Sequence, residues 1–575
     1  MQITRILQLQ LHIAAASSTA HPMFSPLLLQ ILMRFFSEYF VRFVDPDPML
    51  YSPATATSIP HLFSMHAGDA GGSQQESLAA VMELLAAAVH QLIVQMPLEG
   101  DLVQSMAELL MALSKTAGPA RMAFLISSPS VGKIFDCVVN NPLKLNFDGM
   151  TAVVRALGCL AARANSESTM LTLCTFVHAK VQALPGLTSH DLTAGTMLSV
   201  ACLRGLASCP KGQDKVLHCL FDACLPVIAL SLQVHSAADD VTKAILLMIR
   251  DYAEVKLSGL PEHSSAILYQ ASMTTLRTFA ARLGTAGYAG NTASAGAEEE
   301  AAYKSDCLLH MLELLNHLST KDFVFDDEDD VAVSGGDFHM SVAEVLLFGF
   351  DFIVQLVTAD LLRSYPTTTD SYFSFTAFIT STYSHELGAR ICALPEEQGK
   401  TLFGTMMQHL LWGAGGIAPF PARQALQSIY SMASFQAASM GMNDPGIGML
   451  VASSIFGHAI DRLLEMILFP NTCEYGIAWD RVDSCANALI GLIVLDNHRF
   501  MQSAQAAMQL FGTGSKPGET GRSGGTASAQ ESLLTSFRKL TTQNGVSLSN
   551  NNKANRQIFV TNFREFILEI RPLVM

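Results

Sequence analysis

The chain has 575 residues, of which 50% are hydrophobic and only 15% are charged. The charged fraction of an average soluble protein is about 25%, so the composition first raises the possibility of a membrane protein. The net charge of −15 and the pI near 5.5 disfavour a nucleic-acid partner, because affinity for phosphates depends on Lys and Arg.

The most apolar runs do not fit a transmembrane helix, which needs about 20 consecutive apolar residues. The run 447–469 is interrupted by charged residues, and the run 193–208 contains Arg204 and is too short. At the N-terminus, His12 interrupts a short apolar run, which makes a weak signal-peptide pattern. Charges recur along one side of otherwise apolar segments, which is typical of helices packed on helices. We therefore expect no membrane insertion.

Apolar residues recur at steps of three and four along most of the chain, for example in 75–95, and this predicts amphipathic helices. Acidic residues in the first turn mark several helix starts, such as Asp239 and Asp240. We expect about twenty helices, with boundaries good to about two to four residues. They cover 22–44, 76–96, 101–115, 119–140, 147–163, 167–183, 190–208, 212–233, 239–256, 262–283, 299–319, 340–357, 369–387, 396–412, 420–439, 448–469, 476–495, 497–511, 528–542 and 553–570.

The best strand candidate is 371–378, where apolar and polar residues alternate. We interpret it as helix, because the run continues past the length of a normal strand. Short connectors with Gly, Pro, Asn or Asp separate the helices, and a helix–turn–helix unit recurs about every 40 to 45 residues, the period of HEAT and armadillo repeats. In such a stack each helix buries two faces, which explains the apolar composition. The expected fold is all-α: a HEAT/armadillo-like right-handed α-solenoid of antiparallel helix pairs, continuous over 1–575.

Four stretches break the helical rhythm and are interpreted as inter-helix loops: 45–75, 284–298, 321–338 and 512–527. The first is rich in Pro and Gly, and the third is acidic. We expect 284–298 and 512–527 to be disordered because of their Gly- and Ser-rich composition.

Motifs for catalysis are absent: there is no GxGxxG, P-loop, GxSxG, HExxH or EF-hand loop. We therefore expect a non-enzyme without cofactor or metal. His310 and His317 share a helical face, but the sequence between them is ordinary and favours a solvated or core-edge pair over a ligand pair. Trp412 and Trp479 are the two tryptophans, and we expect both in the helical core.

The chain contains 11 cysteines but no CxxC pair. One group has gaps that do not match a zinc site, so we interpret its members as buried free thiols in a reducing compartment. The group is Cys202, Cys209, Cys219 and Cys224.

The sharpest local feature is the acidic run Asp326, Asp327, Glu328, Asp329 and Asp330. Consecutive acids repel one another on a helix, so this run predicts a solvated loop. Two readings stay open: a solubilising loop, or a landing site for a Lys- and Arg-rich protein cargo. Phenylalanines on both sides of the run would help to tie the loop to the helices. A calcium site is the weakest reading, because the ligand spacing and the central Gly are missing.

The C-terminal half of the chain resembles the exportin-4 family of the importin-β (karyopherin) superfamily. In 307–330 a Leu-rich helix leads through a Lys-Asp-Phe turn into the acidic run, and 341–375 continues with the family's order of elements. The helix opened by Leu-Pro-Glu in 393–413 and the closing helix pair in 532–570 are also similar. Weaker similarity extends back to 25–40.

This resemblance implies a nuclear export receptor that binds protein cargo together with Ran-GTP, contacts nucleoporins and shuttles between nucleus and cytoplasm. It implies a basic cargo similar to translation factor 5A, and some members also import transcription factors. The family is about twice this length and carries much of its Ran-gripping surface in an N-terminal half, so we expect a C-terminal portion. In that case the first helices, including Leu27–Phe43, should expose an apolar face. The alternative is a HEAT-repeat scaffold or adaptor outside transport.

Overall fold

A computed structural model of the chain describes most of its residues. The described ranges are 2–15, 25–39, 74–115, 119–140, 145–235, 239–285, 297–323, 341–416, 418–441, 454–469, 479–512 and 526–574. Within these ranges the chain forms 24 α-helices and no strands. The predicted all-α class is confirmed.

The chain divides into two compact units, which are described separately. The first unit comprises Met1–Thr285 and Thr320–Met340, and the second comprises Ala286–Ser319 and Ser341–Met575. The α-helices of the first unit are α1 (Gln2–Ala15), α2 (Pro26–Tyr39), α4 (Gln74–Gln95), α5 (Gly100–Lys115), α6 (Pro119–Ser127), α7 (Pro129–Val139), α8 (Phe147–Arg163), α9 (Glu167–Ala183), α10 (Ser189–Ala207), α11 (Asp214–Val234), α12 (Asp239–Lys256) and α13 (Glu262–Thr285).

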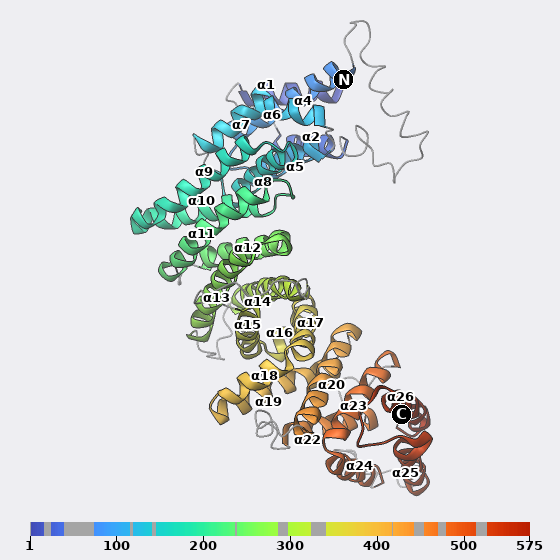
Figure 1. Cartoon of the computed structure of the whole chain (residues 1–575). Helices are drawn as coiled ribbons and strands as arrows, with labels where there is room; N and C mark the ends of the chain where they lie inside the picture. The colour runs from blue at the N-terminus through green and yellow to red at the C-terminus, as the bar shows by residue number, and fades with distance from the viewer. Residues whose placement is uncertain are drawn as a thin grey trace. The chain divides into compact units, whose positions relative to one another are not determined.

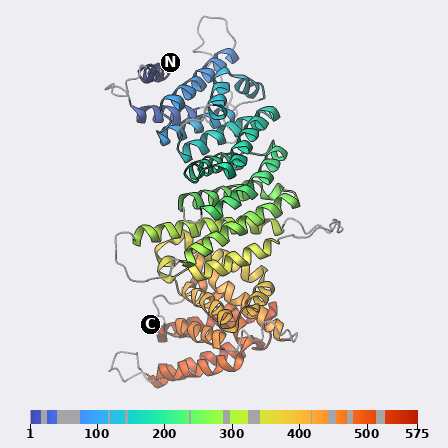
Figure 2. The ribbon, with the colours of Figure 1, turned by 90° about the vertical axis from the view of Figure 1, so that its left-hand side faces the viewer.

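In the first unit, alternate helices pack side by side in two series. One series runs α2, α5, α8, α10, α12, and each member contacts the next. The other contains α1, α4 and α7, followed by α9, α11 and α13. Figures 1 and 2 show these helices succeeding one another in chain order from blue to green. Since each inner helix has a neighbour on both sides, it buries apolar side chains on two of its faces, as the composition predicts.

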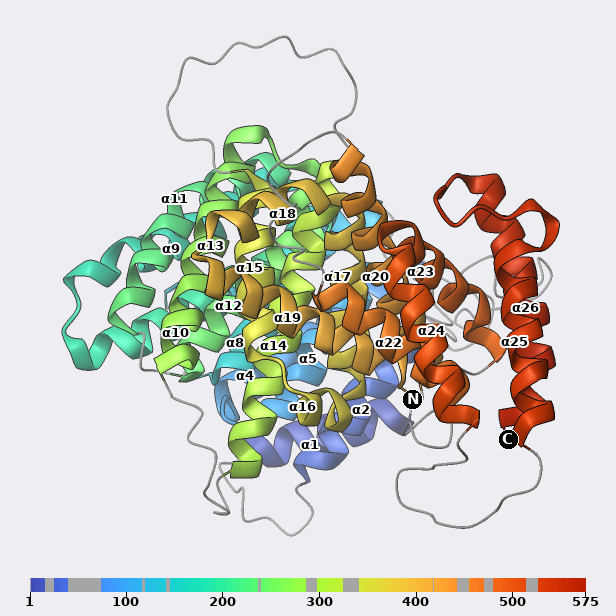
Figure 3. The ribbon, with the colours of Figure 1, turned by 90° about the horizontal axis from the view of Figure 1, so that it is seen from below.

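The second unit repeats this arrangement. Its α-helices are α14 (Ala297–Ser319), α15 (Val342–Leu356), α16 (Ala359–Ser364), α17 (Pro366–Thr382), α18 (Ser384–Ala393), α19 (Glu396–Ala414), α20 (Pro419–Gly441), α22 (Ser454–Leu468), α23 (Val482–Leu495), α24 (Asn497–Gly512), α25 (Thr526–Thr542) and α26 (Lys553–Val574). One series runs α14, α17, α20, α23, α26, and the other runs α15, α19, α22, α24, α25. In Figure 3, α25 and α26 lie side by side at the C-terminal end.

Local sequence explains several helix boundaries. Asn146 caps α8 by accepting the Gly149 N–H at 2.7 Å, and Ser341 caps α15 by accepting the Glu344 N–H at 3.2 Å. Such side-chain caps satisfy backbone donors that the first helical turn leaves without a partner. The strand-like segment 371–378 lies inside α17, which confirms its interpretation as helix.

Two helix predictions were wrong in detail. The expected helix 119–140 is split into α6 and α7, because Ser128 caps a new helix whose first residue is Pro129. The expected helix 369–387 begins earlier, at Pro366, and breaks at Tyr383 before α18. The short helix α16 and the N-terminal helix α1 have no counterpart in the predicted set.

The expectation of an exposed apolar face on Leu27–Phe43 agrees with the structure of α2. Leu27, Ile31 and Phe35 are exposed by 64, 54 and 41%. They recur at steps of four, opposite the side of α2 that carries the buried Leu29. Residues 40–43 lie outside the described ranges.

One described helix is long and apolar enough to cross a membrane by length and composition. It is the Asp214–Leu232 window of α11, with mean hydropathy 1.7, and 44% of it is buried by the rest of the protein. This window was not among the apolar runs weighed as transmembrane candidates from the sequence. In the first unit α11 packs between α9 and α13, and a single such helix is weak evidence because core helices of soluble proteins show the same property.

Candidate functional site

The predicted cargo-binding run, Asp326 to Asp330, lies outside the described residues, as does most of each predicted loop. The described chain ends just before it, in a short 3₁₀ helix at Thr320–Phe323. Both readings of the acidic run, solubilising loop or landing site, therefore stay predictions.

Lys321, in the Lys-Asp-Phe turn before the acidic run, is anchored in the first unit. It is only 7% exposed, and its ammonium donates to the Leu260 carbonyl at 2.8 Å and to the Ser265 hydroxyl. Burial lowers the pKa of Lys321, while nearby Glu262 opposes that change. The anchor on this side of the run is thus a buried lysine, which sequence analysis did not single out.

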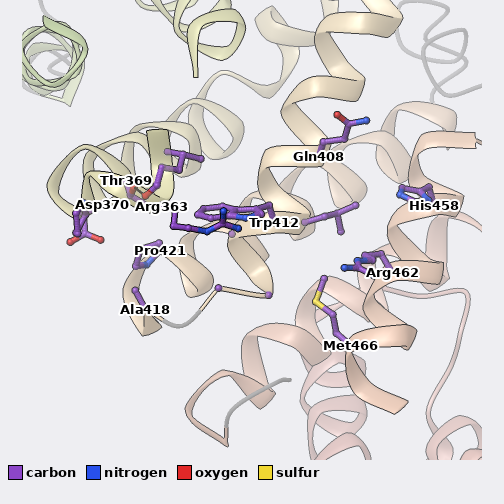
Figure 4. A pocket seen from close by; sticks show the side chains of 16 residues that line it. Arg363, Thr369, Asp370, Gln408, Trp412, Ala418, Pro421, His458, Arg462 and Met466 are labelled. Carbon is purple, nitrogen blue, oxygen red and sulfur yellow. Dashed lines mark hydrogen bonds between the residues drawn. The ribbon is translucent and has the colours of Figure 1, made fainter. Parts of the chain in front are cut away.

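A surface cavity of about 430 Å³ lies in the second unit. Its walls come from α16, the first turn of α17, the end of α19, the first turn of α20 and one side of α22. Figure 4 shows Trp412 at the centre. Arg363 and Asp370 lie on one side of the indole, and His458 and Arg462 lie on the other (Figure 4). The volume is at the small end of the range for ligand sites, which suits one or two side chains of a partner.

Helix ends keep this cavity open. Helix α17 starts with Pro366 and α20 starts with Pro419. At the first position of a helix the backbone N–H has no partner within the helix, so proline, which lacks this N–H, costs no hydrogen bond there. Between them, α19 closes its last turn with a hydrogen bond from the Gly415 N–H to the Leu411 carbonyl at 3.2 Å. Because Gly415 and Gly416 carry no side chain, nothing from this turn fills the space beside Trp412.

The floor of the cavity is fixed by aromatic packing. The Trp412 ring stacks on Phe373 of α17, with centroids 6.5 Å apart and an interplanar angle of 15°. A Cβ at Gly413 would lie 2.4 Å from Cζ of Phe373, so this close approach requires glycine. Phe373 is fully buried and has little room to yield. The position of Trp412 is therefore set by the contact between α17 and α19.

A buried polar pair lies one turn before Trp412. The hydroxyl of Tyr372 and Nδ1 of His409 are hydrogen-bonded at 2.9 Å. Burial lowers the pKa of His409 to about 4 and raises the pKa of Tyr372, because both charged forms lose their hydration there. At neutral pH this contact between α17 and α19 therefore carries no charge.

The rim of the cavity carries charged residues of both signs. Arg363 and Arg462 line it, against the single carboxylate of Asp370. Arg363 pairs with Asp360 at 3.4 Å and Arg462 pairs with Glu465 at 2.5 Å, and all four side chains are at least 40% exposed. Exposed pairs of this kind contribute about 0 to 1 kcal/mol, so either arginine can exchange its partner for a ligand at little cost.

A second cavity, between α22 and α24, shares His458 with the first. The carboxylate of Asp461 there accepts hydrogen bonds from Arg499 and Ser503. In the ranges that the structure describes, no three His, Cys, Asp or Glu side chains are grouped so that they could hold a metal ion.

The cysteines singled out by spacing are all free thiols. Cys202, Cys209 and Cys224 are buried, and burial raises the pKa of Cys202 and Cys224 to about 12. Cys219 is exposed, so its interpretation as a buried thiol was wrong. On α11 it lies on the side of the helix that the neighbouring helices leave uncovered.

His310, of the predicted pair on α14, contacts two carboxylates. It lies 3.3 Å from Asp306 and 2.9 Å from Glu313, on one partly buried face of the helix where the His310 side chain is 15% exposed. Trp479 is 49% exposed and lies under the guanidinium of Arg571, so its expected place in the core was wrong.

No protein-family model matches the chain. The resemblance to the exportin-4 family thus rests on the sequence stretches themselves. In the second unit, 307–319 forms the end of α14 and 342–356 forms α15.

The cavity was not predicted from the sequence, because its lining residues lie far apart in the chain. Arg363 and Arg462 come from different helix pairs, and Trp412 was assigned to the core. The available signal was the segment 412–421, where three glycines and two prolines follow a tryptophan. Such a segment marks a helix end that has little side-chain bulk.

Proposed function

We propose that this chain is a protein-binding helical-repeat receptor, and that it serves as a nuclear export receptor of the exportin-4 type. The observation that carries the first part is the regular packing of successive helices in two series within each unit. Such stacks present long surfaces to other proteins. The second part rests on the resemblance of 307–330, 341–375, 393–413 and 532–570 to that family.

The proposed architecture is a right-handed HEAT/armadillo-like α-solenoid of antiparallel helix pairs through 1–575. The positions of the helices support a repeat: α9, α11 and α13 begin at Glu167, Asp214 and Glu262, at steps of 47 and 48 residues, slightly longer than the predicted 40 to 45. Small-angle scattering tests the idea, because a solenoid gives an elongated particle and a globule of this mass does not.

The proposed partners are Ran-GTP, nucleoporins and a basic protein cargo of the translation factor 5A type. Cargo and receptor would meet in the nucleus and part in the cytoplasm after GTP hydrolysis. The net charge of −15 supports a basic cargo, since opposite charges steer association and raise its rate. The acidic run at 326–330 is the first place to look for that contact.

A scaffold or adaptor outside nuclear transport is the second candidate. The same two series of helices would serve it equally well, and it does not require any nucleotide-dependent partner. The two functions therefore differ in their response to Ran.

The deciding experiment is a pull-down of the basic cargo with the full-length product of the gene that encodes this chain. Three samples contain Ran-GTP, Ran-GDP or no Ran. An export receptor retains much more cargo with Ran-GTP than in the other two samples. Equal retention in all three would refute the export function and favour the scaffold.

A further inference from the structure

We propose that Cys159 and Cys209 are a redox-sensitive pair, in which a small peroxide oxidises Cys159 first and a reversible disulfide to Cys209 follows. This modification site goes beyond the proposed export function and requires no transport partner. The proposal rests on the contact between the two thiols, the close approach of their helices and the cationic side chains around one of them.

The two thiols meet where α8 packs on the end of α10. Cys159 belongs to α8, and Cys209 follows the last turn of α10. The two residues are 4% and 0% exposed, and the Cys209 thiol is hydrogen-bonded to the Cys159 sulfur. The contact is therefore made inside the protein, away from solvent.

Glycines bring the two helices close together at this point. A Cβ at Gly158, the neighbour of Cys159, would lie only 2.4 Å from the Cys209 sulfur. One turn before Cys209, a Cβ at Gly205 would lie 2.7 Å from the Thr151 carbonyl oxygen of α8. A disulfide requires the backbones of its two cysteines to be close, so the bond can form here with little movement of either helix.

Cys159 is the more reactive thiol of the pair. The hydrogen bond from Cys209 lowers the pKa of Cys159 to about 7, against the opposing effect of burial. Arg163, Arg155 and Lys115 also favour its thiolate. Because the thiolate is the form that attacks a peroxide, Cys159 carries a nucleophile at neutral pH.

The neighbouring thiols remain protonated at neutral pH. The hydrogen bond with Cys159 raises the pKa of Cys209, and burial raises it further. Burial raises the pKa of the other thiols of this region to about 12, and these are Cys174, Cys202 and Cys224. Cys209 is thus suited to resolve the oxidised form of Cys159, and the other thiols are poor first nucleophiles.

The chemistry balances in two steps. The Cys159 thiolate attacks one oxygen of hydrogen peroxide, the O–O bond breaks, and hydroxide leaves, so that the sulfur becomes a sulfenic acid. The Cys209 sulfur then attacks the Cys159 sulfur, the S–O bond breaks, and the Cys209 proton leaves with the hydroxide as water. Two thiols are oxidised to one disulfide while one peroxide is reduced to two waters.

The disulfide would join two neighbouring members of the series α2, α5, α8, α10, α12. It would close a chain loop that contains α9 and α10, which constrains the unfolded chain and stabilises the first unit. In a reducing compartment such a bond is transient and reports the presence of an oxidant.

The test uses the full chain with Cys219→Ser and Cys392→Ser, which removes the thiols that are exposed among the residues the structure describes. The reduced protein is treated with hydrogen peroxide at neutral pH, unfolded in N-ethylmaleimide, digested and analysed by mass spectrometry. Two further variants, Cys159→Ser and Cys209→Ser, each remove one member of the pair. Cys202→Ser, a buried thiol on α10, is the matched control.

We expect a linked Cys159–Cys209 peptide as the main product, reversed by dithiothreitol and accompanied by a rise of a few degrees in melting temperature. Cys209→Ser should stop at a sulfenic acid on Cys159, which dimedone traps. Cys159→Ser should leave Cys209 reduced, and Cys202→Ser should form the disulfide at an unchanged rate. Between about pH 6 and pH 8 the rate should rise about tenfold, as the thiolate fraction of Cys159 does.

Three results would each overturn the proposal. The first is an unmodified Cys159 at a peroxide concentration that oxidises the exposed thiols of the unsubstituted chain. The second is oxidation of Cys202 as fast as that of Cys159, and the third is a disulfide from Cys209 to Cys174. If Cys209→Ser fails to fold, the linked peptide of the chain that keeps both thiols decides. Failure here leaves the Ran-dependent pull-down untouched, so the two proposals fail separately.

Discussion

Replacing His409 with Gln should remove part of the acid sensitivity of the second unit. Burial lowers the pKa of His409 from its ordinary value of 6.5 to about 4, and the side chain is only 9% exposed. As pH falls, the unfolded chain therefore takes up a proton on this residue before the folded chain does. The folded state is favoured fully above about pH 6.5 and loses stability as pH falls toward about 4.

The magnitude follows from the size of the pKa change. A fall from 6.5 to about 4 corresponds to roughly 3 kcal/mol of folding free energy, of which about 2.5 kcal/mol is lost by pH 4.5. Gln keeps a polar partner for the Tyr372 hydroxyl but cannot take up a proton. His409→Gln can differ from the parent in unfolding free energy at pH 7 for other reasons. Only the change in that difference with pH tests the pKa of His409.

The assay is urea unfolding followed by circular dichroism between about pH 7 and pH 4.5. The difference in unfolding free energy between His409→Gln and the parent should shift in favour of the variant by roughly 2 to 3 kcal/mol over this range. His498→Gln, on exposed α24 surface, is the control and should follow the parent. Parallel loss of stability in parent and His409→Gln would refute the reasoning.

Four further changes have defined outcomes. Gly413→Ala should lower the unfolding free energy by about 1 to 3 kcal/mol and alter Trp412 emission, because the alanine Cβ would collide with the Phe373 ring. An unchanged melting temperature would contradict the close contact between Gly413 and Phe373. Lys321→Met should cost about 1 to 3 kcal/mol in urea unfolding, since the Leu260 carbonyl loses its buried donor; no loss would show that water replaces it. Ile31→Glu should raise solubility without lowering the melting temperature, because the side chain is 54% exposed; a drop of several degrees would mean that it is covered in solution. Neutralising residues 326–330 should slow association with a basic cargo and flatten its salt dependence; unchanged rates at low salt would leave only the solubilising role.

The fold class follows from sequence because helical periodicity is repeated over the whole chain. The errors fall where one residue decides a boundary, as Pro129 does by starting α7 directly after the Ser128 cap. The apolar sequence around Trp479 also predicted a place in the core. In the structure Trp479 begins a 3₁₀ helix, and its ring lies under Arg571 of the last helix. A side chain at a helix end is covered only if a distant segment reaches it, and periodicity does not carry that information.

The cavity was beyond sequence reasoning for a related reason. Trp412 looks like any aromatic residue in an apolar helix, and only the packing of α17 on α19 shows that one side of its ring borders open space. Arg363 and Arg462 look like ordinary surface residues in i, i+3 pairs with acids. Their convergence on one cavity depends on which helices pack together. By contrast, the acidic run at 326–330 was visible at once, because its signal is local.

The most direct test of the export receptor is the coupling between Ran and cargo. The affinity of the basic cargo for the full-length gene product is measured by calorimetry with and without saturating Ran-GTP, and the affinity of Ran-GTP is measured with and without cargo. The account predicts that each ligand tightens the other by the same factor, of about tenfold or more. A factor of one in both directions would contradict it.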